Sequence, residues 1–286
     1  MSVYRDYDLD ALEAEYDIEA TVDSLEAYTS RYEAMSAQVV EQSRPQLDLL
    51  YGPEPLQALD AFPAKSAAAP ILVYIHGGYW IRGDKAAGLF PAACFNAAGA
   101  VWVAINYRLA PDVHLDDIVS DVRHAISFIY QNARRIGGDP DRLYIAGSSA
   151  GGHLTGMLLA EGWQKAHNVP ANVIKGACAI SGLHDLEPFL LTSQKTYLKL
   201  DRPAVLRNSP IRNLGPAGST LLVAWGGRET AEFQRQSKAY AEACVEAGLN
   251  LETIFMAEQN HFSMTGELAD PDSPLTSAIL RLMRLT

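Results

Sequence analysis

The sequence predicts an α/β fold with a doubly wound, mostly parallel sheet and helices on both faces. Short apolar runs alternate with helical patterns along most of the chain, and parallel strands need such helical crossovers. The clearest strand signals are residues 71–75 (ILVYI) and 100–107 (AVWVAINY), which are apolar on both faces, as in a covered sheet. With 286 residues and 48% hydrophobic composition, the chain is long enough to bury a large core.

Each element is assigned from its apolar periodicity and its end signals. Residues 1–45 have apolar side chains at three- to four-residue spacing and predict an N-terminal helical extension. Residues 184–215 contain three prolines and are too long for an ordinary loop, so they predict a small cap-like insertion. One domain over residues 1–286 is expected. Its strands are expected at 47–51, 71–75, 100–107, 143–146, 174–180, 220–225 and 251–256, and its helices at 85–98, 114–136, 153–161, 231–247 and 275–285.

Composition and charge argue against several classes of protein. The 23 basic and 34 acidic residues give a formal net charge of −11, which repels phosphate backbones and anionic lipids. We therefore expect a small-molecule partner, with no nucleic acid and no membrane. The three cysteines are far apart, which argues against a disulfide scaffold or a zinc site. The acidic start lacks the apolar run of a signal peptide, so we expect a cytoplasmic protein, with monomer and homodimer both open.

A short Gly/Ser-rich turn contains the strongest candidate nucleophile. Residues 147–151 read Gly-Ser-Ser-Ala-Gly, which fits the G-x-S-x-G pattern between an expected strand and an expected helix. The flanking glycines allow a sharp turn without clashes between Cβ atoms and the neighbouring backbone. The helix N-terminus beneath the serine favours negative charge. We therefore predict that Ser149 is the nucleophile.

A serine hydroxyl needs a nearby base, and that base needs an acid to orient it. His261 lies in a loop after the last expected strand, at the sheet edge where ligands bind in doubly wound folds. Glu229 follows the expected strand at 220–225, and the chain order Ser149, Glu229, His261 is the order that accompanies this nucleophile pattern. We predict His261 as the base and Glu229 as the acid. Asp185, which follows an earlier strand, remains the alternative acid.

A second glycine-rich turn, residues 76–80 (HGGYW), follows the expected strand at 71–75. Attack on a carbonyl carbon builds negative charge on the oxygen, and the backbone amides of such a turn can stabilise it. We predict that the amides of Gly78, Tyr79 and Ala150 form this oxyanion hole. His76 is expected to hold the turn through a hydrogen bond.

Aromatic and basic side chains flank these turns. Trp80 and Phe262 are candidates for the lining of a substrate pocket, although ordinary packing explains each of them equally well. For Arg82 a surface position is favoured over contact with a substrate carboxylate.

These segments together resemble the α/β-hydrolase fold and, within it, the kynurenine formamidase (arylformamidase) group. That group reads HGGxW where esterases of the hormone-sensitive-lipase type read HGGG, and residues 76–80 follow the former. Residues 106–111 (NYRLAP) resemble the strand-exit motif of both groups, and residues 260–262 (NHF) resemble the histidine loop. Glu229 is a mild departure, because aspartate is common at that position in the group. The resemblance extends over nearly the whole chain.

The resemblance implies hydrolysis of an N-formyl aryl amide or a small carboxylic ester, without metal or cofactor. In the implied mechanism Ser149 attacks the carbonyl carbon, His261 takes the serine proton, and Glu229 orients His261. Two alternatives stay open: a carboxylesterase with no formamidase role, and a non-catalytic hydrolase fold that binds a ligand. A receptor of the second kind is expected to lack a triad member, and all three are present.

Overall fold

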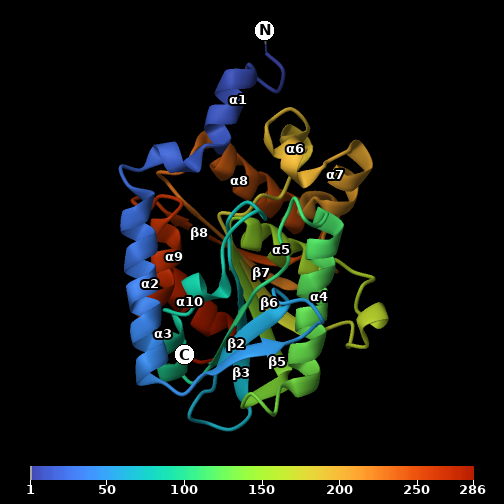
Figure 1. Cartoon of the computed structure of the whole chain (residues 1–286). Helices are drawn as coiled ribbons and strands as arrows, with labels where there is room; N and C mark the ends of the chain where they lie inside the picture. Colours follow the sequence, from blue (N-terminus) through green and yellow to red (C-terminus); the bar gives the residue numbers. More distant parts are fainter. Residues whose placement is uncertain (1) are drawn as a thin grey trace.

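The computed structural model describes residues 2–286, and within them eight strands form one sheet (Figure 1). The strand order is β1-β2-β4-β3-β5-β6-β7-β8. β1 pairs with β2 and β2 with β4 in antiparallel fashion, whereas every other pair is parallel. The strands are β1 (Gln46–Leu50), β2 (Ala58–Phe62), β3 (Ala69–Ile75), β4 (Val101–Ile105), β5 (Gly138–Ser148), β6 (Ile174–Ile180), β7 (Thr220–Gly226) and β8 (Asn250–Met256).

Helices cover both faces of this sheet, so the predicted fold class is confirmed. The α-helices are α1 (Leu9–Tyr16), α2 (Leu25–Gln42), α3 (Ala92–Ala97), α4 (Leu115–Asn132), α5 (Ala150–Leu159), α6 (Gln194–Leu198), α7 (Arg202–Asn208), α8 (Ala231–Glu246), α9 (Ser263–Gly266) and α10 (Pro274–Leu282). Across residues 2–286, none of the helices has both the length and the apolar character that crossing a bilayer requires.

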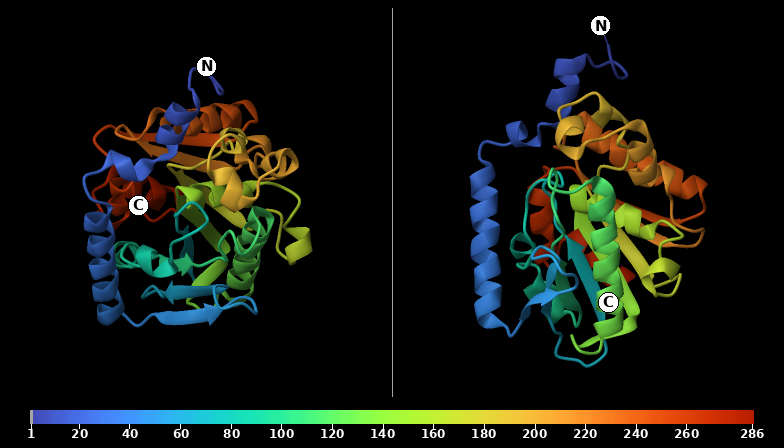
Figure 2. Two further views of the ribbon diagram at one scale, coloured as in Figure 1. Left: turned by 45° about the horizontal axis from the view of Figure 1, so that its top comes forward. Right: turned by 45° about the vertical axis from the view of Figure 1, so that its right-hand side comes forward.

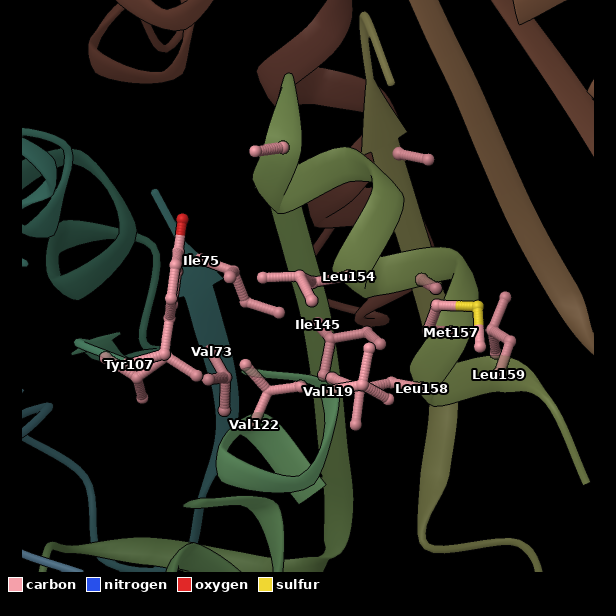
Figure 3. Close-up of a cluster of buried hydrophobic side chains, with 14 of the residues drawn as sticks. Val73, Ile75, Tyr107, Val119, Val122, Ile145, Leu154, Met157, Leu158 and Leu159 are labelled. Atoms are coloured by element: carbon pink, nitrogen blue, oxygen red, sulfur yellow. The ribbon is translucent and has the colours of Figure 1, made fainter. Parts of the chain in front are cut away.

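The two faces of the sheet bury separate layers of the core, because successive side chains of a strand point to opposite sides. One face packs against α4 and α5 through Val73, Ile75, Ile145, Val122 and Leu154 (Figure 3). The opposite face packs against α3 and α10 through Leu72, Trp102, Cys178, Leu222 and Ile279. This double burial explains why the strand sequences are continuously apolar, and it fixes the strand ends on which the site is built.

The structure adds one strand to the expected elements and corrects one expected helix. The strand β2 is not recognised from its sequence, ALDAF, because its Asp60 looks like a loop residue. In the fold Asp60 is buried and pairs with the Lys85 ammonium at 2.9 Å. The single helix expected at 85–98 is wrong: a 3₁₀ turn at Lys85–Gly88 is followed by α3, which begins only after Pro91. Proline has no amide hydrogen and cannot continue a preceding helix.

The N-terminal extension and the 184–215 excursion meet above the carboxyl ends of the strands (Figure 2). The helix α2 runs along one side of the molecule, and α1 lies beside the excursion that carries α6 and α7. The Tyr16 ring meets the edge of Phe189 with 4.7 Å between centroids. The Ser193 hydroxyl donates a hydrogen bond to Glu13 at 3.0 Å. The two segments therefore support each other over the sheet edge.

Two histidines are fully buried beside this edge and are expected to make stability depend on pH. Burial lowers the pKa of His153 from 6.5 to about 4 and that of His184 well below 6.5. Between about pH 4 and 6.5 the unfolded chain therefore binds more protons, so folding stability decreases as the pH falls. Each histidine contributes up to about 1.4 kcal/mol per pH unit to that slope.

Urea unfolding at about pH 7.5 and about pH 5 measures this effect, and equal free energies of unfolding at both would contradict it. A matched variant is His153→Gln, which keeps a donor for the Asn208 carbonyl that the ring reaches at 2.6 Å. We expect this variant to flatten the pH dependence.

Candidate active site

Ser149 occupies a sharp turn between β5 and α5, at the carboxyl end of the central strand. Its backbone has φ +59° and ψ −118°, a conformation that L-residues rarely adopt and that is common at functional sites. Only glycine fits two positions before Ser149 and two positions after it. A Cβ on Gly151 would lie 2.0 Å from the Ile75 carbonyl oxygen, and one on Gly147 would lie 2.2 Å from the Gly151 oxygen. The side chain of Ser149 is thereby held at the top of the sheet.

The turn after β3 lies directly against Ser149. A Cβ on Gly77 would be 3.1 Å from the Ser149 Cβ, so the glycine permits this close approach. Gly78 and Tyr79 have positive φ values of 112° and 52°. Within residues 2–286 neither of their amides donates a hydrogen bond, and the amide of Ala150 belongs to the unpaired first turn of α5. These three amides therefore remain candidate donors in the two turns, and Gly78 and Tyr79 line the same cavity as Ser149.

His76 holds the turn, as expected from the sequence. Its Nδ1 donates a hydrogen bond to the Gly77 carbonyl at 2.7 Å. The ring stacks on Tyr107 with 4.3 Å between centroids, and the Tyr107 hydroxyl donates to the His76 carbonyl at 2.9 Å. Burial lowers the pKa of His76, which keeps the ring neutral near pH 7.

Glu229 and His261 face each other in a buried position. Nδ1 of His261 lies 3.8 Å from Oε2 of Glu229, and within the described chain neither atom has a hydrogen-bond partner. The other carboxylate oxygen, Oε1, accepts hydrogen bonds from the Ser181 hydroxyl and, at 2.8 Å, from the Gly226 amide. The carboxylate is thus anchored through Oε1 and leaves Oε2 turned toward the imidazole.

Ser149 and His261 line one cavity of about 480 Å³. No hydrogen bond joins the two side chains anywhere in the described structure. Catalytic hydrogen bonds are often long without substrate and shorten when substrate binds. The position of both side chains in one cavity wall is compatible with such a bond in the substrate complex. His76, Gly77, Gly78 and Tyr79 line the same cavity. The two glycine-rich turns and the histidine loop therefore converge.

The N-terminal extension forms part of the wall of this cavity. Its lining residues are Ile18, Leu25, Tyr28, Thr29, Tyr32 and Glu33, from the 3₁₀ helix Ile18–Thr21 and from α2. None of the residues that line the cavity in the described chain comes from the 184–215 excursion. The extension covers the site directly, whereas the excursion supports α1.

The extension also holds the loop of His261 on both sides. Asn260 Nδ2 donates to the Tyr28 hydroxyl at 2.8 Å, and the Tyr32 hydroxyl donates to the Phe262 carbonyl at 2.9 Å. Phe262 also packs near Tyr28, with 5.8 Å between ring centroids. These contacts join residues more than two hundred positions apart, so no local sequence pattern signals them.

The loop of Glu229 is held by the same extension. The Thr230 hydroxyl donates to the Glu15 carbonyl at 2.7 Å, and the Glu232 amide donates to the Glu15 carboxylate at 2.9 Å. Tyr16, the next residue, donates its hydroxyl proton to Glu232 at 3.0 Å. One N-terminal segment therefore contacts both loops that carry the candidate acid and base.

Not every residue suggested by the sequence lies in the cavity wall. Phe262 lines it, but Trp80 does not: its side chain is 0% exposed and packs edge-on against His153 with 4.8 Å between centroids. As a candidate pocket residue Trp80 is therefore corrected to a core residue. The alternative acid Asp185 accepts a hydrogen bond from the Glu187 amide at 3.1 Å, which closes its own turn. The sequence alone does not identify Ser181, whose hydroxyl donates to Oε1 of Glu229. The two residues are forty-eight positions apart, so no local pattern signals this contact.

Comparison with known proteins identifies similar chains. Residues 59–199 match the family model BD-FAE. The chain is 32% identical over 296 residues to a kynurenine formamidase of Danio rerio, covering 99% of both chains. It is 33% identical over 245 residues to a kynurenine formamidase of Salmo salar, covering 83% of this chain and 81% of that protein. A solved structure of a proposed thioesterase from Silicibacter sp. tm1040 superposes with a TM-score of 0.82 and 28% identity, covering 94% of this chain and 98% of the other.

Proposed function

Because the chain belongs to the kynurenine formamidase family of the α/β-hydrolases, we propose that it hydrolyses an N-formyl aryl amide through Ser149. The chain is a hydrolase of the ester and formyl-amide class. The observation that carries the proposal is that Ser149 and His261 line one cavity, with the Glu229 carboxylate 3.8 Å behind the imidazole. Such a group makes a serine hydroxyl nucleophilic at neutral pH.

In the first half of the reaction, Oγ of Ser149 attacks the formyl carbon while Nε2 of His261 takes the hydroxyl proton. The carbonyl oxygen becomes an oxyanion, which the amides of Gly78, Tyr79 and Ala150 stabilise. Removing one such donor from other hydrolases lowers kcat by about 10²–10³. The carbon–nitrogen bond then breaks as His261 gives its proton to the leaving arylamine, and a formyl ester of Ser149 remains.

In the second half, water replaces the amine. His261 takes a proton from the water, the hydroxide adds to the formyl carbon, and the ester bond to Ser149 breaks with return of the proton to Oγ. Formate leaves and the free enzyme is restored. Glu229 remains ionised throughout, holding the imidazole in position and stabilising its cation without taking the proton.

Kinetics with two substrates test the proposed function. We expect the protein to turn over N-formylkynurenine. The kcat/KM for this substrate is compared with the kcat/KM for the ester p-nitrophenyl acetate. Rapid ester turnover beside no detectable formamide cleavage would contradict the formamidase proposal and favour the carboxylesterase.

The anchor of Glu229 gives a second test. Ser181→Ala removes one of the two donors to Oε1, so the carboxylate orients His261 less well. We expect kcat to fall about 10-fold, with a smaller change in KM. Ser237→Ala is a matched control, because this serine is also fully buried on α8 and its hydroxyl has no partner within the described residues. Equal kcat values for both variants would contradict a positioning role for Ser181.

A further inference from the structure

Among the described residues that line the cavity, Arg82 alone carries a permanent positive charge. Its backbone belongs to the oxyanion turn, since the Arg82 amide donates to the Gly78 carbonyl at 3.1 Å. A Cβ on Gly78 would lie 3.1 Å from Cγ of Arg82, so the arginine side chain begins against this turn. The arginine side chain therefore begins on the same backbone segment that carries the proposed oxyanion donors Gly78 and Tyr79.

The Arg82 guanidinium has one exposed ion-pair partner in the folded protein, which leaves part of it open to solvent. It pairs with Glu19, which lies in the N-terminal extension, and the two side chains are 50% and 41% exposed. An exposed ion pair of this kind adds little stability, so a better placed anion can displace Glu19. Arginine also offers a planar fork of donors that matches a carboxylate.

The other charged groups of the cavity wall are acidic, so an anionic ligand is expected to bind at Arg82. The other charged residues of the cavity wall are Glu33 and Asp84. Asp84 is already engaged, because its two oxygens accept from the Ala86 amide and from Asn106 Nδ2, each at 2.8 Å. With a formal net charge of −11, the protein repels an anionic ligand wherever a local cation is lacking.

We infer that Arg82 binds the carboxylate of the substrate, which replaces Glu19 on the guanidinium, and that the cavity selects aryl amides bearing such a group. This inference rests on the proposed function for the identity of the reacting bond, and it adds a specificity-determining residue to it. The position of Arg82 beside the oxyanion turn places the carboxylate end of the ligand near the turn. The aromatic walls of Tyr28, Tyr32 and Phe262 surround the remainder of the cavity.

Binding of a reaction product tests the inference without any turnover. Kynurenine and kynurenamine differ by the carboxylate alone, and calorimetric titration of the full chain with each gives two dissociation constants. We expect the wild-type protein to bind kynurenine about 10- to 100-fold more tightly than kynurenamine. Arg82→Gln is expected to remove most of this preference, and Glu19→Gln to strengthen kynurenine binding about twofold or more, because it frees the guanidinium.

Arg281→Gln is the matched control. Arg281 forms a comparable exposed pair with Glu252, with exposures of 54% and 50%, and does not line the cavity. This variant is expected to keep the full preference for kynurenine. A wild-type protein without the preference, or an Arg82→Gln variant that retains it, would overturn the inference. Because no bond is cleaved in this assay, loss of the preference and failure of formamide hydrolysis are observed separately.

Discussion

Replacing Ser149 with alanine is expected to lower kcat for ester and formamide substrates by about 10⁴- to 10⁶-fold. The variant lacks the oxygen that forms the acyl-enzyme, so only binding and the oxyanion donors remain to assist direct attack by water. The measurement is steady-state turnover of N-formylkynurenine and p-nitrophenyl acetate at equal enzyme concentrations. Residual activity above about 1% of wild type would be incompatible with Ser149 as the nucleophile.

The loss is expected to occur without unfolding. Alanine keeps the Cβ atom at the backbone position with φ +59°, so the turn is no more strained than with serine. The Ser149 amide still donates to the Ile180 carbonyl, which it reaches at 2.9 Å. We therefore expect a circular-dichroism spectrum like that of the wild type and a Tm within a few degrees of it. A lower Tm would mean that inactivity reflects damage to the fold.

Glu229→Gln is expected to lower kcat by about 10³- to 10⁴-fold although it adds no bulk. Oε1 accepts from the Ser181 hydroxyl and the Gly226 amide, and the carbonyl oxygen of a glutamine satisfies both donors. Its NH₂ group is then directed toward Nδ1 of His261. Two donors cannot share this contact, so Nδ1 must be unprotonated and Nε2 protonated. A protonated Nε2 cannot take the proton of Ser149.

Two observations check this explanation. Combining Glu229→Gln with Ser149→Ala is expected to give no further loss beyond Ser149→Ala alone, because residues that act as one unit are not additive. Retention of more than about a tenth of wild-type kcat in Glu229→Gln would show that the acid acts elsewhere. Asp185 would then be the next variant to measure, since it is the other acid suggested by the sequence.

The fold was predictable where its signals are local. Continuous apolar runs mark strands that are covered on both faces, and glycine-rich turns mark the sharp bends after β3 and β5. The strand β2 was not predictable because its Asp60 is neutralised by Lys85, twenty-five positions away in sequence. Burial of a charge depends on its partner, and the pattern of a single segment does not reveal that partner.

The candidate site shows the same division between local and distant signals. The sequence motifs led to Ser149 and His261, whereas the Ser181 anchor requires contact between loops forty-eight positions apart. The sequence places Tyr28 and Tyr32 only in a helical extension, because their contacts with the His261 loop span more than two hundred residues. For Trp80 the sequence leaves pocket lining and core packing equally open, because the direction of its side chain depends on tertiary packing against His153.

The activation of one serine hydroxyl is the claim on which the proposed mechanism depends. The most direct measurement is mass spectrometry of the folded protein after reaction with a fluorophosphonate, which phosphonylates activated serines. The predicted result is one adduct per chain, found on the peptide that contains Ser149 and missing when His261 is replaced by alanine. A folded wild-type protein that stays unlabelled, or an adduct on a different residue, would contradict it.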